Sequence, residues 1–356
     1  MASVGLDFTQ ITPDNGAVRE VNKLVFLEVL QADRIGTLLD IHRNVFSGDK
    51  LGLIGEFGLL GKEGQGCSPE YGNDAINTAE KEWEIKAWQV AEQLCYEDVE
   101  NTLVKYTLEN GTNIADMTAN DYLDEIVVPR LELALMKMFI RIAFFADKDA
   151  ENVSDGGIIK DGVDVDYFNL IDGIWKQIYA GVTAGTTPRV TISANAEATK
   201  ADQINAISSQ AVDVLDDMIA SASPRLRQAS NQVILVTQSF ATGFEAQLLK
   251  TYYGSELQWK SLFAGIRETT YRGIKIRVVP MFDEIIQNYE GTATAYNLPH
   301  RALYTTEQNL ALGVNGTDEF SQLDIFFERK ERLNYIFATD KMGAMVIDES
   351  MAVVAY

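Results

Sequence analysis

Residues 332–356 read RLNYIFATDKMGAMVIDESMAVVAY, and the sequence stays apolar through its last residue, Tyr356. Chain ends commonly carry polar residues and fray. An apolar strand left unpaired would instead be a template for aggregation. The final residues, 351–356, therefore predict a strand that pairs inside a sheet of the same chain, and the rest of the sequence must supply that sheet.

The segments before this end also predict strands. QLDIFFERKERLNYIFATD (322–340) predicts two long strands or one bent strand, and DKMG (340–343) predicts a turn into AMVID. ALYTTEQNLALG (302–313) predicts another pair of strands. YRGIKIRVVPMF (271–282) predicts a turn followed by an alternating strand that a proline stops.

A compact α/β region precedes these strands. Residues 170–180 predict a short amphipathic helix, and the capping-box pattern that begins at Thr199 predicts a second helix, which continues to Met218. QVILVTQ (232–238) has the composition of a buried strand. Ser239 follows this strand and can cap the next helix.

The segment from Asn120 to Asp147 predicts the longest helix. Its apolar residues recur every three or four positions; they are Leu123, Val127, Leu131, Leu135, Met138, Ile142 and Phe145. Pro129 lies inside this pattern, so we expect a kink or a restart there. The full segment would form a rod of roughly 40 Å.

Residues 39–92 predict a long extended hairpin rather than a compact unit. A strand-like stretch, 38–46, leads into a run with six glycines, and apolar residues alternate on the way back from Trp83. The return segment is ambiguous, because apolar residues between Trp83 and Leu94 also fit a helical spacing.

The composition indicates a globular protein with a large excess of acid. The chain has 356 residues, 46% of them hydrophobic, and 52 acidic residues against 30 basic ones give a net charge of -22. Nucleic-acid binding depends on Lys and Arg at the phosphates, and an anionic membrane surface would repel this chain. We therefore expect neither specific nucleic-acid recognition nor membrane attachment.

Targeting signals and disulfides are not expected either. The start of the chain has no basic region followed by an apolar stretch, and two cysteines, Cys67 and Cys95, are too few for a disulfide framework. The most apolar segment, 134–146, is too short to span a bilayer. We expect synthesis in the cytoplasm.

The sequence offers few residues for catalysis. The two histidines, His42 and His300, have no partners at the spacing of a triad or a zinc site, so we interpret both as surface or strand-face residues. The glycine-rich run places Glu63 after Gly61 and Lys62, where a phosphate loop needs a hydroxyl, so it predicts a flexible loop. We expect no cofactor and no enzymatic activity.

Two weaker patterns have simple structural interpretations. Asp161, Asp164 and Asp166 could offer oxygen ligands to calcium, but the segment lacks the calcium-loop pattern and a closing glutamate. Ser239 is not part of a G-x-S-x-G nucleophile elbow, so capping of a helix is the simpler role.

The order of these features resembles the major capsid protein of tailed bacteriophages, with the Hong Kong 97-type fold. The likeness is strongest in YRGIKIRVVPMF (271–282), ALYTTEQNLALGV (302–314) and the closing segment, 326–356, and covers the chain from about residue 17. The resemblance implies an α+β fold with an N-terminal arm, an extended loop that is a long β-hairpin, a peripheral domain with a long spine helix, and an axial α/β domain.

The resemblance also implies boundaries. They are 1–38 for the N-terminal arm with a helix, 39–92 for the extended loop, 93–150 for the peripheral domain with the spine helix, 151–312 for the axial domain, and 313–356 for C-terminal strands that return through the peripheral to the axial domain.

A chain of this family is a structural shell subunit. The resemblance implies assembly with itself, as hexamers and pentamers, into an icosahedral head that encloses the DNA genome, after synthesis in a bacterial host cytoplasm. It further implies a scaffolding protein, a portal and a decoration protein as partners, and only non-specific contact with packaged DNA. Contacts between subunits are expected at Phe57, Leu59, Leu60, Lys62, Trp83 and Trp88.

Two alternatives stay open. An encapsulin-type nanocompartment shell has the same fold but encloses a cargo enzyme, and such chains are generally shorter. A soluble α/β enzyme would place the C-terminal strands in a core sheet beside a deep pocket. The missing catalytic constellations count against the enzyme, and the long arm and loop favour the phage protein over the nanocompartment.

Overall fold

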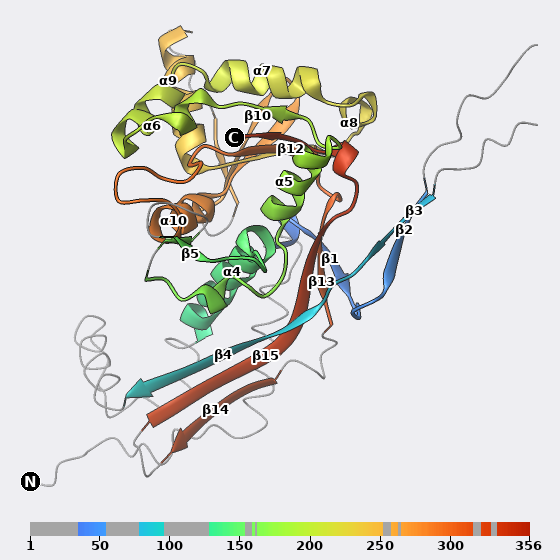
Figure 1. Ribbon diagram of the computed structural model, residues 1–356, viewed down its shortest axis with the longest axis vertical. Helices are drawn as coiled ribbons and strands as arrows, with labels where there is room; N and C mark the ends of the chain where they lie inside the picture. Colours follow the sequence, from blue (N-terminus) through green and yellow to red (C-terminus); the bar gives the residue numbers. More distant parts are fainter. Residues whose placement is uncertain are drawn as a thin grey trace, which may run out of the picture.

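The computed structural model shows a mixed α+β chain built on two main sheets (Figure 1). Among the helices that it describes, none has both the length and the apolar character that crossing a membrane requires. The residues described are 35–54, 78–95, 128–153, 159–160, 162–251, 258–262, 265–315, 322–328 and 333–356.

The larger sheet has seven strands, and its order places the last strand of the chain inside it. Four neighbouring pairs are antiparallel, whereas β11–β8 and β16–β7 are parallel. In sheet order the strands are β7 (Arg189–Val190), β16 (Val353–Ala355), β12 (Ala302–Thr306), β8 (Gln232–Val236), β11 (Ile274–Val278), β10 (Arg267–Tyr271) and β9 (Lys260–Ser261).

Helices cover both faces of this sheet, because its central strands are apolar on both sides. Ile234 and Val236 of β8 belong to the core with α6, α7 and α9, whereas Val233 and Leu235 belong to the core with α4, α5 and α10. The described helices are α4 (Val128–Phe145), α5 (Ile174–Ala184), α6 (Lys200–Ile207), α7 (Ala211–Ser221), α8 (Pro224–Gln228), α9 (Gln238–Thr251) and α10 (Pro280–Tyr289).

The second sheet is built on the 14-residue strand β15. One edge of β15 pairs with β4, and the other edge pairs first with β14 and then with β13, which continues to β1 in a parallel pair. The bounds are β1 (Asp40–Arg43), β4 (Lys86–Cys95), β13 (Leu310–Val314), β14 (Gln322–Glu328) and β15 (Leu333–Val346).

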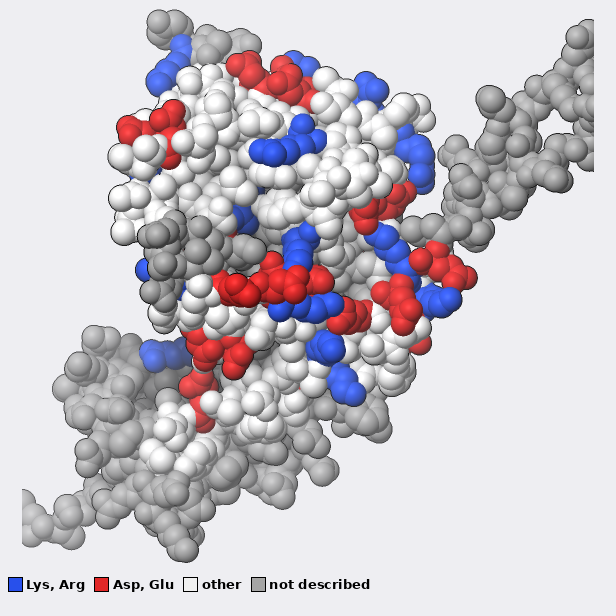
Figure 2. All heavy atoms as spheres, in the orientation of Figure 1, with Lys and Arg blue, Asp and Glu red and all other residues white. Residues whose placement is uncertain are grey.

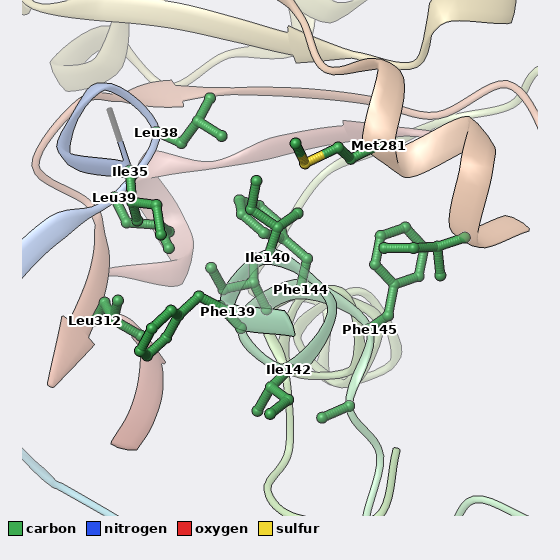
Figure 3. Close-up of a cluster of buried hydrophobic side chains, with 14 of the residues drawn as sticks. Ile35, Leu38, Leu39, Phe139, Ile140, Ile142, Phe144, Phe145, Met281 and Leu312 are labelled. Atoms are coloured by element: carbon green, nitrogen blue, oxygen red, sulfur yellow. The ribbon is translucent and has the colours of Figure 1, made fainter. Parts of the chain in front are cut away.

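Helix α4 joins the two sheets, since its side chains pack toward both. Phe139 meets Trp88 of β4 edge to face, with ring centroids 5.7 Å apart. Phe144 meets Phe282 of α10, with centroids 4.7 Å apart. Figure 3 shows the labelled side chains of α4 between Met281 of α10 and the start of the described chain.

The start of the described chain is tied to this centre. Ile35 and Leu39 are fully buried. Arg277 of β11 is also buried; it donates to the carbonyl oxygen of Thr37 and pairs with Glu268 of the neighbouring strand at 2.8 Å. Residues 35–39 are therefore fixed by apolar burial and by a hydrogen bond from Arg277.

Several predicted elements are confirmed. Arg272 and Gly273 both have positive φ angles (49° and 84°) and form the two-residue turn between β10 and β11, which suits the twist of a hairpin. The strands predicted at 232–238 and 302–313 are present, although the second segment sends its two strands to different sheets. The described helix α4 begins at Val128, next to Pro129; its 18 residues correspond to about 27 Å.

Two predictions are wrong. The predicted turn at 340–343 does not form, because β15 runs straight through it to Val346. The helix predicted to run on to Met218 ends at Ile207 and restarts at Ala211. At the break the hydroxyls of Ser208 and Ser209 donate to carbonyl oxygens three residues earlier, and such local bonds compete with helix continuation.

The end of the chain is held as the sequence predicts. Strand β16 lies between β7 and β12, and Val353, Val354 and Ala355 are fully buried. Val354 faces the core around α4 and its two neighbours face the opposite core. The final strand thus closes both cores at once.

We expect Val354→Asp to unfold or strongly destabilise the chain, by at least about 3 kcal/mol, because it buries an unpaired carboxylate. Thr191→Asp places the same charge on an exposed position beyond β7 and should change stability by less than about 0.5 kcal/mol. Denaturant unfolding of the two variants measures both values. Similar stability for the two would contradict the role assigned to β16.

Candidate functional site: the hairpin arm and its elbow

A two-stranded hairpin leaves the body beside the second sheet. β2 (Lys50–Ile54) and β3 (Thr78–Glu82) are antiparallel, and within the described ranges they pair only with each other. Figure 1 shows them at the right, with β3 leading into β4, which crosses the molecule. We call β2 and β3 the hairpin arm, and residues 83–85 the elbow.

The arm confirms the predicted hairpin at its base. The return segment, which the sequence left ambiguous, is a strand on both sides of the elbow, because ten consecutive residues of β4 pair with β15. Residues 55–77, which include the glycine-rich run, lie outside the described part of the chain.

Two glycines make room for the elbow on the second sheet. Gly313 of β13 and Gly343 of β15 are cross-strand partners. A Cβ atom at Gly313 would lie 2.8 Å from the indole ring of Trp83, and one at Gly343 would lie 2.3 Å from the carbonyl oxygen of Glu84. Real Cβ atoms do not approach so closely, so the elbow can rest here only on glycine.

Apolar and backbone contacts hold the elbow in place. Trp83 and Ile85 are buried in a small cluster with Val45, Ala311 and Met345. The backbone N–H of Trp83 donates to the carbonyl oxygen of Asp49 at 2.8 Å, and its own carbonyl accepts from Gly48 at 3.0 Å. These bonds join the two sides of the hairpin just below the arm.

Two lysines add an ionic clamp on the elbow. Lys81 pairs with Glu349 at 2.8 Å and donates to the carbonyl oxygen of Val346 at 2.9 Å. Lys148, which follows α4, pairs with Glu84 and lies 3.3 Å from Asp172. A cavity of about 230 Å³ separates these two contacts, between the elbow, α5 and β15.

The clamp shifts the ionisation of its members. The hydrogen bond to Glu84 raises the pKa of Lys148. Partial burial opposes ionisation of Asp172, but hydrogen bonds from the backbone and side chain of Lys148 lower its pKa overall. Glu349 follows the same pattern, with partial burial outweighed by bonds from Lys81 and Thr186. These three groups are therefore held in their charged forms at neutral pH.

The six residues expected at subunit contacts divide into two groups. The four in the glycine-rich run lie outside the described residues; they are Phe57, Leu59, Leu60 and Lys62. Trp83 and Trp88 are buried within their own chain, one in the elbow and one against α4. As contacts between subunits, all six stay predictions.

His300 corrects an interpretation made from the sequence, because it is fully buried rather than on a surface. Its Nε2 lies 2.9 Å from the carbonyl oxygen of Gln203, which can only accept, so this nitrogen bears the proton. Its Nδ1 lies 3.1 Å from the hydroxyl of Ser239. Burial lowers the pKa of His300 to about 4. His42, in contrast, is partly exposed beside Asp40.

Ser239 is not the cap of α9, contrary to the prediction. Asp283 of α10 caps the helix instead, because its carboxylate accepts hydrogen bonds from the backbone N–H groups of Gln238 and Ser239. Burial raises the pKa of Asp283, and these hydrogen bonds oppose the shift. The Ser239–His300 contact therefore lies in a partly buried hydrogen-bond network between α9, α10 and the start of β12, in which both histidine nitrogens have partners.

The aspartates considered for calcium serve a local turn. Asp164 accepts from the backbone N–H of Asp166 at 3.0 Å, and Asp166 accepts from the side chain of Asn169. Asp161 lies outside the described residues. Over the ranges that the structure describes, no three acidic, histidine or cysteine side chains gather as a metal site would need.

Comparison with known proteins identifies similar folds only among solved structures. No protein-family model matches the sequence, and no curated protein matches it either. The chain is similar to phage capsid structures.

Two of these structures and a virus-like particle illustrate the similarity. The satellite phage P4 procapsid with size determination protein shares 14% identity over 88% of this chain and 92% of that chain, with a TM-score of 0.45. A structure from Gordonia phage Cozz has 11% sequence identity, over 90% of this chain and 85% of that chain, with a TM-score of 0.49. A virus-like particle from Pyrococcus furiosus has 9% sequence identity, over 96% of this chain and 98% of that chain, with a TM-score of 0.39.

Gly343→Ala should destabilise the chain by about 1–3 kcal/mol, because the added methyl group overpacks the contact with the Glu84 backbone. Gly52→Ala is the matched control: its Cβ would meet nothing within 4 Å. Thermal unfolding of both variants tests the contact. A Gly343→Ala variant as stable as Gly52→Ala would show that the elbow does not rest on β15.

His300 should make stability depend on pH in a defined window. The unfolded chain protonates this residue below about pH 6.5, whereas the folded chain keeps it neutral down to about pH 4. The contribution of His300 to the free energy of unfolding is therefore present above about pH 6.5 and is lost as the pH falls toward 4. The loss is about 2 kcal/mol between pH 7 and pH 5.

Denaturant unfolding at pH 7 and pH 5 measures this contribution. His300→Gln should lose that part of the pH dependence, whereas His42→Gln, at the other histidine of the chain, should keep it. If the free energy of unfolding changed equally with pH in the wild type and in His300→Gln, the interpretation of His300 as a neutral buried histidine would be contradicted.

Proposed function

We propose that this chain is the major capsid protein of a tailed bacteriophage, and that it assembles as hexamers and pentamers into an icosahedral shell around DNA. The projecting hairpin arm is the observation that carries the proposal. An isolated two-stranded hairpin is only marginally stable in water, so an arm of this kind gains stability when a surface outside its own body covers it. A neighbouring copy in a shell supplies such a surface.

The proposal assigns each described element to a part of the Hong Kong 97-type fold. The arm and elbow belong to the extended loop, 39–92, and α4 belongs to the peripheral domain, 93–150, as its spine helix. The seven-stranded sheet with its helices belongs mainly to the axial domain, 151–312. Strands β14 to β16 belong to the returning segment, 313–356, and the N-terminal arm would be 1–38.

A structural role suits the side chains described above better than an enzymatic one. His300 is fully buried and held neutral by burial, and both of its ring nitrogens already have partners. The polar groups nearest the arm are paired with one another in the elbow clamp. Such pairing fixes geometry, which is what a shell subunit needs.

The charge of the chain suits a container for DNA. A net charge of -22 disfavours adhesion of the wall to packaged phosphates. Figure 2 shows that the viewed face is not uniformly acidic: acidic and basic side chains mix in a band across its middle. The proposal further implies a scaffolding protein, a portal and a decoration protein as partners, and location in the virion.

Electron microscopy of the protein expressed alone and with its scaffold, with light scattering beside it, tests the proposal. We expect closed shells, tubes, or rings of five and six copies. A homogeneous monomer or dimer that does not change with concentration or with a co-expressed scaffold would overturn it. Small uniform shells loaded with a cargo enzyme would instead identify an encapsulin-type nanocompartment.

A further inference from the structure

A cavity of about 350 Å³ lies between the end of α4, α5 and the loop that leads to β12. The rings of Phe145, Trp175 and Tyr179 contribute to its wall, which is mainly apolar. An apolar cavity of about 150 Å³ is enough to bind benzene in another protein. This cavity is larger, so it can admit one aromatic side chain.

The floor of the cavity is charged but already neutralised. Arg301 and Glu290 form an ion pair whose side chains are only 2% and 4% exposed. Arg301 also donates to the carbonyl oxygen of Leu298 at 2.9 Å and lies over the rings of Phe145 and Trp175, 5.3 and 5.7 Å from their centroids. Because the pair is satisfied internally, the floor favours an uncharged occupant.

The rim of the cavity is acidic. Lys176 and Asp147 line the opening, and Lys176 is shared among Asp147, Asp149 and Asp172. Asp149 has the most open position, with 87% of its side chain exposed. Asp172 and Glu84 also pair with Lys148, so this cluster holds two lysines and four carboxylates. The net charge is negative, and a cation beside the occupant would complement it.

An exposed aromatic side chain of the kind this cavity can admit lies elsewhere on the same chain. Phe46 is 59% exposed, more than any other large apolar side chain among the described residues. It lies in the turn between β1 and β2, where Asp49 accepts from its backbone N–H at 2.7 Å and Gly48 has a φ of 94°. The turn is thus fixed by its own contacts. Arg43, three residues earlier, is exposed and forms no ion pair with the described residues.

The other exposed apolar side chains are poorer candidates. Tyr167 already packs under the guanidinium of Arg141, 5.4 Å from the ring centroid. Leu133, Ile204 and Leu249 are aliphatic and project from the sides of helices. Phe46 is not among the residues that line the cavity of its own chain. In Figure 1 the turn between β1 and β2 lies apart from α5 and α10.

We propose that Phe46 of one copy inserts into the cavity formed by Phe145, Trp175 and Tyr179 of a second copy. Arg43 of the inserting copy then lies beside Asp149 of the receiving copy. The contact joins two different surfaces, so it propagates from copy to copy around a ring instead of closing a dimer. This inference rests on the proposed self-assembly and names one of its contact surfaces.

The protein concentration at which rings or shells appear, measured by light scattering, tests the contact. Phe46→Ala and the cavity-filling variant Thr183→Trp should each raise this threshold at least tenfold. Leu249→Ala removes a similarly exposed apolar side chain that does not line the cavity, and it should leave the threshold unchanged. Circular dichroism and thermal unfolding confirm that each variant folds as the wild type does.

Charge exchange provides an independent test, because both side chains are exposed. Arg43→Asp and Asp149→Arg should each raise the threshold, and the double variant Arg43→Asp/Asp149→Arg should restore it to within about threefold of wild type. Failure of the double variant to recover would overturn the pairing of Arg43 with Asp149.

Disulfide crosslinking tests whether the two surfaces are in direct contact. With Cys67 and Cys95 replaced by serine, a Phe46→Cys/Thr183→Cys variant should form a ladder of disulfide-linked multimers on oxidation, and neither single variant should. If wild-type protein assembles but these variants neither raise the threshold nor crosslink, the inference fails and the proposed function stands. If the wild type never assembles, the proposed function itself fails.

Discussion

The structure depends on a contact in which one strand of backbone lies directly on another sheet. Gly313 and Gly343 leave a bare patch on β13 and β15, and the elbow rests on it through Trp83 and the backbone of Glu84. Any side chain at Gly343 would lift the elbow from the sheet. The direction of the arm, the pairing of β4 with β15 and the burial of Trp83 all follow from this absence of side chains.

Single elements also connect separate parts of the fold. Helix α4 serves as a shared core element for both sheets, and β16 buries residues into cores on both faces of the larger sheet. Charged groups are placed where segments distant in the sequence meet: Arg277 with Thr37, Lys81 with Glu349, and Asp283 with the start of α9. Each of these groups sets a geometry that apolar packing alone would leave adjustable.

Local patterns in the sequence were sufficient for elements that satisfy themselves locally. The buried strand at 232–236, the turn at Gly273, the helix after Thr199 and the final strand were all predictable from composition and capping. Helix α10 was missed because Pro280 was interpreted as a stop, although proline also suits the first turn of a helix.

The candidate site was much less predictable, because it is made by contacts between distant segments. DKMG has the composition of a turn, and only the approach of Glu84 shows that Gly343 is needed inside a strand. His300 looks like a surface residue until Gln203 and Ser239, far away in the sequence, provide its partners. The unbroken path from β3 through the elbow into β4 also has a mechanical consequence. A pull along the arm loads the ten-residue ladder between β4 and β15 lengthwise, so its hydrogen bonds bear tension together in shear instead of peeling apart one by one.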